Sequence, residues 1–246
     1  MATPVFFAQT VRGARAKSRL RTAAKRPRRH RVGVLDVDTY ALLRPVLDRV
    51  NRAQTGFEFA QVTTTLPTGI GLMSARVLQI AKDTGFEPNA NEIEDLEQNV
   101  FFDDFVPFLE QIRDKLKLNS IVALVTPMLA FVDDENTFQY NLFSVSNGGV
   151  VMVSAFALRD YAKKAKRPFE ACIAALMATQ VWAGLFEDVD YHEETRGCLY
   201  DLCTPRDDIV KGLTKMRISE GALALFPESE RADVQKAVQA IAEYKR

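Results

Sequence analysis

The fold of this chain is decided by residues 32–62, which begin with Val32-Gly-Val-Leu-Asp-Val-Asp38 and end with Phe57-Glu-Phe-Ala-Gln-Val62. The first segment is a short apolar run bounded by charge and the second alternates, so each predicts a strand. Between them Thr39 is suited to cap a helix, and the apolar residues that follow recur at steps of three and four positions: Leu42, Leu43, Val46, Leu47 and Val50. A strand, a helix and a strand within about 32 residues predict a βαβ unit with a parallel pair and a right-handed crossover.

The later part of the chain predicts further strands. Ile121-Val-Ala-Leu-Val125 is apolar throughout and predicts a buried strand. Residues 138–146 and 150–153 flank the turn sequence Asn147-Gly-Gly149, which is the clearest hairpin signal in the chain.

Helices are predicted on both sides of this hairpin. Asn91 is placed to cap a helix whose apolar positions extend to Leu116, and Pro107 should kink or split it. After Pro168, residues 171–182 are apolar almost all round, which predicts a central buried helix. A last amphipathic helix is expected over residues 229–244. Together these elements predict an α/β (α+β) single domain with a mixed sheet, a central buried helix and a late β-hairpin.

The composition is that of an ordinary globular protein. The 246 residues are 47% hydrophobic and 26% charged, and the longest apolar runs are far short of a membrane span. Three cysteines without a framework spacing argue against a disulfide-stapled secreted protein. We therefore expect a cytoplasmic protein with no membrane association.

The charge is unevenly distributed, which predicts a basic arm over residues 1–31 and a folded body over residues 32–246. The arm contains ten Lys and Arg residues and no acid, which leaves 22 basic and 32 acidic side chains, a net charge of about −10, in the body. A segment of this kind buries little apolar surface, so we expect it to be disordered. It could dock on the acidic body, bind the phosphates of a nucleic acid, or be a transit-type presequence. The polyanion-binding candidates are Arg12, Arg15, Arg19, Arg21, Lys25, Arg26, Arg28 and Arg29.

Chemistry-bearing residues gather in Tyr191-His-Glu-Glu-Thr-Arg-Gly-Cys-Leu-Tyr-Asp-Leu-Cys203. Imidazole and thiolate are ligands that zinc prefers, so His192, Cys198 and Cys203 are candidate metal ligands. The set falls short of four ligands, and the chain has no CxxC pair. His192 and Glu193 are the candidates for a catalytic role.

Three other interpretations of this segment stay open. His192, Glu193, Glu194 and Asp201 could form a mixed metal or hydrolytic centre with Asp207 and Asp208. Cys198 or Cys203 could form a nucleophile pair with His192. The plainest interpretation is a solvated loop in which Glu193 or Glu194 pairs with Arg196 and the cysteines pack in the core.

The order of these segments resembles the plan of the archaemetzincins, which are zincin-fold metalloproteases related to the metzincins. The resemblance rests on the βαβ start, the later strand, the hairpin that ends in Val-Ser, the buried helix, the histidine-bearing segment and the Gly197-Cys198 turn. It covers residues 118–226 and, more loosely, the βαβ start. It implies a zincin-like fold with a catalytic zinc held by HExxHxxGxxH and a structural zinc held by four cysteines.

This chain departs from that pattern at both metal centres. Its central helix reads Ala174-Ala-Leu-Met-Ala-Thr-Gln-Val-Trp-Ala-Gly184, without a histidine or a carboxylate. A hydrolytic zinc needs about three protein ligands, and His192 alone matches one of them. Cys198 matches the cysteine turn and Cys203 would be a second structural ligand, whereas Ser219 and Ala222 stand at the spacing of a lost pair.

The resemblance and its departures predict a pseudoenzyme that binds a protein or peptide as a regulatory or scaffold subunit. In zincins a strand at the cleft edge pairs with extended substrate, and the equivalent edge here would carry Tyr140, Leu142, Phe143 and Val145. No cofactor is expected, and zinc is the one that the segment could still hold. The alternatives are an active metallopeptidase with atypical ligands and a nucleic-acid-associated protein that uses the basic arm.

Overall fold

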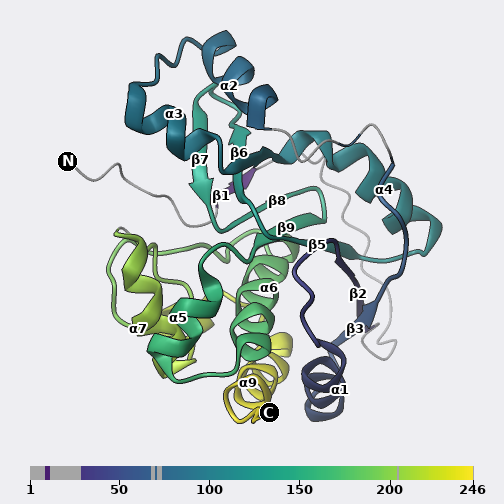
Figure 1. The fold of residues 1–246 in the computed structure, drawn as a ribbon. Coiled ribbons are helices and arrows are strands. Elements are labelled where there is room, and N and C mark those ends of the chain that lie inside the picture. The colour runs from purple at the N-terminus through teal and green to yellow at the C-terminus, as the bar shows by residue number, and fades with distance from the viewer. Residues whose placement is uncertain (1–8, 12–28, 68–69, 71–73, 204, 246) are drawn as a thin grey trace.

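The βαβ unit expected at the start of the body is present in the computed structural model, which describes residues 9–11, 29–67, 70, 74–203 and 205–245 (Figure 1). It consists of β2 (His30–Asp36), α1 (Arg44–Ala53) and β3 (Phe57–Gln61), and the two strands pair in parallel. Thr39 does not cap α1, because its backbone N–H and hydroxyl donate to Asp36 Oδ1 at 2.9 and 2.7 Å. Leu42 therefore lies outside the helix and is exposed.

The main sheet has the strand order β1-β8-β9-β5-β2-β3. Its remaining strands are β1 (Gln9–Val11), β5 (Ser120–Val125), β8 (Ser144–Asn147) and β9 (Val150–Ser154). β5 lies between β2 and β9 and is parallel to both, whereas β8 and β9 form the expected antiparallel hairpin. Gly148 and Gly149 have positive φ angles of 57° and 86°, which explains why this turn is built from glycine.

Helices bury both faces of this sheet. From β5, Val122 and Leu124 pack in the cluster that contains α6 (Phe169–Leu185), and Ile121, Ala123 and Val125 pack in the opposite cluster with α4 (Val106–Lys115). α6 runs through the centre of the molecule and is buried on nearly all sides, as expected (Figure 1). The expected mixed α/β architecture is confirmed.

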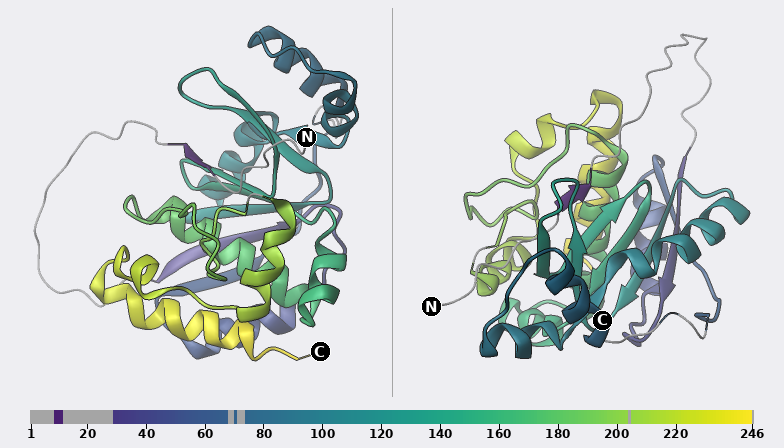
Figure 2. Two further views of the ribbon diagram at one scale, coloured as in Figure 1. Left: turned by 90° about the vertical axis from the view of Figure 1, so that its left-hand side faces the viewer. Right: turned by 90° about the horizontal axis from the view of Figure 1, so that it is seen from above.

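A second, three-stranded sheet has the order β4-β6-β7 and lies on the side of α2 and α3 (Figures 1 and 2). Its strands are β4 (Asn99–Phe101), β6 (Met128–Val132) and β7 (Phe138–Leu142). The helix expected over residues 91–116, kinked or split at Pro107, is divided into α3 and α4, and the division lies before Pro107, where β4 and η1 interrupt it. Asn89, rather than Asn91, caps α3 with a capping box, and Pro107 lies in the first turn of α4.

The C-terminal helix α9 (Glu228–Ala242) packs against α1 and α6, close to the expected bounds. The other helices of the described residues are α2 (Ser74–Asp83), α3 (Ala90–Leu96), α5 (Leu158–Ala165), α7 (Ile209–Lys215), α8 (Glu220–Ala224) and the short η1 (Phe102–Asp104) and η2 (Arg206–Asp208). Within the described ranges no single helix is long and apolar enough to cross a membrane; α5 and α6 pass that test as a pair but are bent by 108°.

Candidate functional site

The loop formed by residues 191–203, which follows α6, closes on itself. His192 N donates to Tyr200 O at 2.9 Å and Leu202 N donates to His192 O at 2.8 Å, so His192 and Asp201 form an isolated parallel bridge. The bridge brings an imidazole and a carboxylate together although eight residues separate them in the sequence.

The carboxylate of Asp201 holds the turn within this loop. Its Oδ2 accepts hydrogen bonds from the backbone N–H groups of Gly197 and Cys198, the second at 2.9 Å. Gly197 has a φ of +78°, and a Cβ there would lie 2.5 Å from the side chain of Lys215, so a larger residue would be strained. Asp201 is 2% exposed, and the two N–H donors offset part of the cost of burying its charge.

The sulfur of Cys198 is held by backbone donors from two segments. Tyr200 N donates to Sγ at 3.4 Å, and Ser219 N, at the start of α8, donates at 3.2 Å. Cys198 is 3% exposed. Two N–H dipoles directed at one sulfur are electrostatically complementary to a negatively charged sulfur, as in metal-bound thiolates.

The ring of His192 has a defined tautomer. Its Nδ1 lies 3.0 Å from Glu194 O and 3.5 Å from Asp201 Oδ1. A carbonyl oxygen can only accept, so Nδ1 carries a proton, and in the neutral ring Nε2 is then the nitrogen with the lone pair. Nε2 is buried, and so is Asp201 Oδ1; neither has a hydrogen-bond partner among the described residues.

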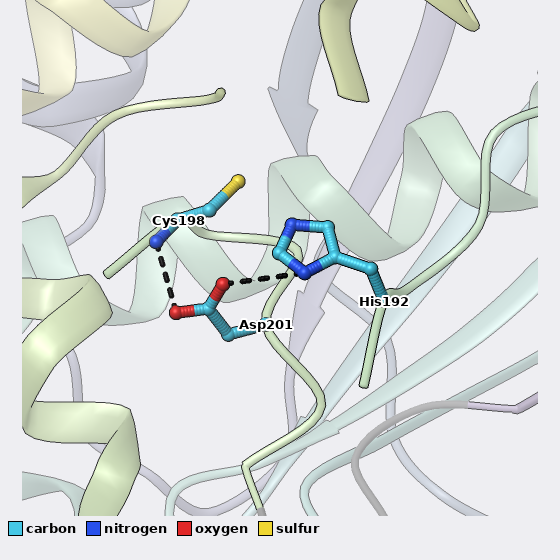
Figure 3. Close-up of side chains that lie close together, drawn as sticks. All are labelled: His192, Cys198 and Asp201. Atoms are coloured by element: carbon cyan, nitrogen blue, oxygen red, sulfur yellow. Dashed lines mark hydrogen bonds and ion pairs between the residues drawn. The ribbon is translucent and has the colours of Figure 1, made fainter. Parts of the chain in front are cut away.

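These three residues form the candidate site. A ring nitrogen of His192, Cys198 Sγ and a carboxylate oxygen of Asp201 lie within 4.8 Å of one another. Figure 3 shows the Nδ1 edge of the ring facing Asp201 and the other ring nitrogen on the side of the Cys198 sulfur. Nitrogen, sulfur and carboxylate oxygen are all zinc ligands, so the donor set fits the metal that the family resemblance implies.

The other residues considered from the sequence do not join this group. Cys203 Sγ donates to Asp201 O at 3.4 Å, and burial raises the pKa of its thiol far above the ordinary value, so it is a buried donor and not a ligand. Glu193 is exposed. Glu194 pairs with Arg196, as the plainest interpretation expected.

Asp207 and Asp208 also lie outside the group. Their carboxylates pair with Lys164 at 3.5 Å and Lys211 at 2.8 Å, respectively. Of the mixed acidic centre considered above, the structure therefore brings together His192 and Asp201 alone.

The nucleophile-pair interpretation receives one favourable observation and one against it. Cys198, His192 and Asp201 lie together as in a Cys–His–Asp triad, because one ring nitrogen is on the side of the sulfur and the other faces the carboxylate (Figure 3). The sulfur, however, is buried and already accepts two backbone N–H groups. A substrate carbonyl could not reach it, so the arrangement favours metal or structural binding over nucleophilic attack.

Aromatic rings fill the space between α6 and its neighbours. Trp182 of α6 and Phe186, which follows the end of α6, pack against Phe226, and Tyr200 packs against the same ring, with centroid distances of 5.6 to 6.1 Å. Tyr200 Oη donates to Thr179 O at 3.1 Å. The region of α6 next to the loop is therefore apolar and close-packed.

The four residues expected at a peptide-binding edge are divided between two sheets. Tyr140 and Leu142 belong to β7 at the edge of the small sheet, Phe143 lies between strands, and Val145 belongs to β8. β8 pairs on its outer side with β1, in parallel, with Val145 opposite Gln9.

The basic arm lies mostly outside the described residues, including seven of its eight polyanion-binding candidates. Of these candidates Arg29 is described, and it donates to Asn51 O at 2.8 Å and Gln54 O at 3.3 Å. β2 begins at His30, inside the range assigned to the arm.

No family model and no curated protein matches this chain. Among solved structures the chain is similar to the archaemetzincin of Archaeoglobus fulgidus, with a TM-score of 0.47 and 8% identity over 80% of this chain and 99% of that chain. It is also similar to the archaemetzincin of Methanopyrus kandleri, with a TM-score of 0.45 and 9% identity over 88% of this chain and 99% of that chain. A zinc-dependent peptidase of Methanocorpusculum labreanum has a TM-score of 0.43 and 14% identity over 79% of this chain and 98% of that chain. The archaemetzincins among them belong to the family whose plan the sequence resembles.

Proposed function

We propose that this protein binds an extended peptide or protein segment along the outer edge of β8 and does not cleave it. The observation that carries this proposal is the pairing of β1 with β8, in which Gln9, Thr10 and Val11 lie opposite Val145, Ser146 and Asn147. A short extended segment thus already lies on this edge. Strand addition supplies affinity through main-chain hydrogen bonds, without a metal or a nucleophile.

Buried side-chain hydrogen bonds to α6 hold β8 in place. Ser144 donates to Gln180 Oε1 at 2.9 Å, and Gln180 Nε2 donates to Ser146 Oγ at 2.9 Å. Both serines and Gln180 are buried. A strand held by its inward side chains keeps its outer N–H and C=O groups in one geometry, which suits the binding of an extended partner.

The placement of the histidines supports the absence of peptidase chemistry. His30 lies in β2, stacked on Phe57 and edge-on to Phe186, with centroid distances of 5.4 and 5.7 Å. His192 lies in the loop after α6, and α6 itself has no histidine. Three histidine ligands therefore cannot gather at one zinc.

An active metallopeptidase with atypical ligands is the weaker alternative. Its ligands would be His192, Cys198 and Asp201, and two of these residues are at most 3% exposed. A catalytic zinc must keep an open position that both water and substrate reach, which this burial opposes.

A peptide-competition experiment tests the proposal. The probe is a fluorescein-labelled peptide of residues 5–15, Val-Phe-Phe-Ala-Gln-Thr-Val-Arg-Gly-Ala-Arg, and the receptors are the full chain and a chain that lacks residues 1–28. The control peptide carries Thr10→Pro and Val11→Pro, which removes two N–H donors but keeps every cation.

The shortened chain should bind the probe at least about tenfold more tightly than the full chain, because β1 no longer occupies the edge, and the proline peptide should bind neither. Equal binding of both peptides, or no binding to the shortened chain, would remove the β8 proposal. Mass spectrometry of the peptide after incubation with added Zn²⁺ should show no cleavage, and cleavage that a chelator abolishes would contradict the pseudoenzyme proposal.

A further inference from the structure

We propose that His192 Nε2, Cys198 Sγ and Asp201 Oδ1 form a binding site for one Zn²⁺ ion that stabilises the loop and takes no part in hydrolysis. This inference is independent of peptide binding at β8. It combines residues that the sequence resemblance assigns to different centres, or to none.

The charges around Asp201 call for a cation. The Asp201 carboxylate is 2% exposed, and no Lys or Arg of the described residues pairs with it. Its ion-pair partner among the described residues is the His192 ring, whose Nδ1 lies 3.5 Å from Oδ1 and also donates to Glu194 O; this pair carries opposite charges only when the ring is protonated. A buried carboxylate is costly unless it is paired or binds a metal. A divalent cation would compensate this charge together with that of a Cys198 thiolate.

The polar atoms that lack partners point to the same position. His192 Nε2 and Asp201 Oδ1 are both buried without a hydrogen bond. Nδ1 donates to a backbone carbonyl, which fixes the ring and leaves Nε2 as the ligand atom; this is the usual outer contact of a metal-bound histidine. The N–H groups of Tyr200 and Ser219 hold the sulfur on the side of Nε2 (Figure 3).

The spacing requires a small adjustment. Tetrahedral Zn²⁺ with ordinary bond lengths separates its N, O and S ligands by about 3.4–3.6 Å. One ring nitrogen of His192, Cys198 Sγ and one carboxylate oxygen of Asp201 lie within 4.8 Å of one another, so side-chain movements of about 1 Å would bring three ligand atoms to these separations. Mixed thiolate, imidazole and carboxylate donors favour Zn²⁺ over Mg²⁺ or Ca²⁺, which prefer oxygen ligands alone. A water molecule would complete four-coordination.

The burial of the ligand residues indicates a structural role for the proposed Zn²⁺ ion. When bound, the ion would act as a cross-link between the histidine end of the loop and the Cys198–Asp201 turn. Because Ser219 N donates to Cys198 Sγ, the cross-link would extend to the start of α8. Three segments that now meet through hydrogen bonds would then share one metal centre.

Cobalt titration of the full-length, chelator-treated protein tests this site. Co²⁺ bound by a thiolate gives an intense sulfur-to-metal absorption band, which reports coordination by cysteine directly. The band should saturate at about one equivalent and disappear when Zn²⁺ is added. Zn²⁺ at about 100 times its Kd should raise the Tm by about 5–10 °C.

Matched variants assign the ligands. Cys198→Ser should abolish the band, whereas Cys203→Ser and Cys172→Ser should keep it, since those thiols lie outside the group. His192→Gln, at a half-buried position that tolerates change, should weaken Co²⁺ binding at least about tenfold while circular dichroism confirms an intact fold. The proposal is overturned if the full chain gives no band, if Cys198→Ser keeps it, or if folded His192→Gln binds Co²⁺ with unchanged affinity.

Discussion

Replacing Asp201 with alanine should destabilise the protein more than any other change to a charged residue in the 191–203 loop. The Asp201 carboxylate accepts the backbone N–H groups of Gly197 and Cys198, and it is 2% exposed. Its removal leaves two buried donors without a partner, and each such donor costs about 1–3 kcal/mol. The two together give about 2–6 kcal/mol, with values toward the lower end if water enters the turn.

Urea unfolding in the presence of a chelator measures this effect without any contribution from metal. For a chain of this length a loss of about 4 kcal/mol lowers the Tm by about 8–16 °C. Asp201→Asn, which keeps one carbonyl acceptor and removes the charge, should fall between wild type and Asp201→Ala.

The matched control is Glu193→Ala, an exposed acid in the same loop, which should change the free energy of unfolding by less than about 0.5 kcal/mol. If Asp201→Ala and Glu193→Ala unfold at the same urea concentration, the carboxylate does not hold the turn and the reasoning is refuted.

Three further predictions follow from other parts of the chain. Gly212→Ala should destabilise the protein although alanine favours helices, because the added Cβ would lie 2.9 Å from Cys198 O. Gly221→Ala has open space at its Cβ and should stabilise the protein by up to about 1 kcal/mol. If urea unfolding ranks the two variants in the reverse order, the packing of α7 against Cys198 is contradicted. Burial raises the pKa of the Cys172 thiol to about 12 from an ordinary value near 9, so its stabilising contribution is complete below pH 9 and is lost as the pH rises from 9 toward 12. Between pH 9 and 11 the free energy of unfolding should fall with pH less steeply in Cys172→Ala than in the wild type, by about 1.4 kcal/mol per pH unit. An unchanged slope would contradict the raised pKa of Cys172. Finally, the cations of residues 1–28 predict that the full chain shifts RNA at low salt and that the chain without them does not; equal shifts by both would mean that the arm is not the contact.

The sequence predicts correctly those elements whose structure depends mainly on residues close together in the chain. β5 is apolar after Ser120, α6 is apolar at most of its positions, and the Asn147-Gly-Gly149 turn requires glycine, so each of these was predictable from neighbouring residues. The helix expected over residues 91–116 was not, because Asn99 makes contacts distant in sequence. Its Nδ2 donates to Asn141 Oδ1 at 2.9 Å, and Asn141 N donates back to Asn99 Oδ1 at 2.9 Å. The pairing of β4 with β6 therefore overrides an apolar spacing that suits a helix.

The strand expected over residues 138–146 failed for a related reason. Asn141 has a φ of 61°, so the chain turns near the end of β7 and β8 begins in the other sheet. Asparagine is among the residues that tolerate this conformation, but the polar and apolar alternation around it gives no sign of the break.

The candidate site was predictable in part. His192 and Cys198 were identified by residue type, and Cys203 was included because thiolates close in sequence suggest a shared metal. Cys203 is directed elsewhere, because its Sγ donates to Asp201 O. The Ser219 N–H that holds the Cys198 sulfur comes from a different segment, so no pattern within residues 191–203 could reveal it.

The β8 edge and the loop site are mechanically connected although their proposed roles differ. Gln180 of α6 accepts from Ser144 of β8 and from the hydroxyl of Tyr191, which precedes His192, at 2.9 and 3.0 Å. Its Nε2 donates to Ser146 Oγ, so the amide is held from both sides and has one orientation. A buried hydrogen-bond network of this kind resists partial rearrangement, because each lost hydrogen bond leaves a polar group without that partner. Ordering of the 191–203 loop would therefore limit the movement of β8 as well. In the proposed binding function the loop would then help to hold the β8 edge in place, which requires no catalytic zinc.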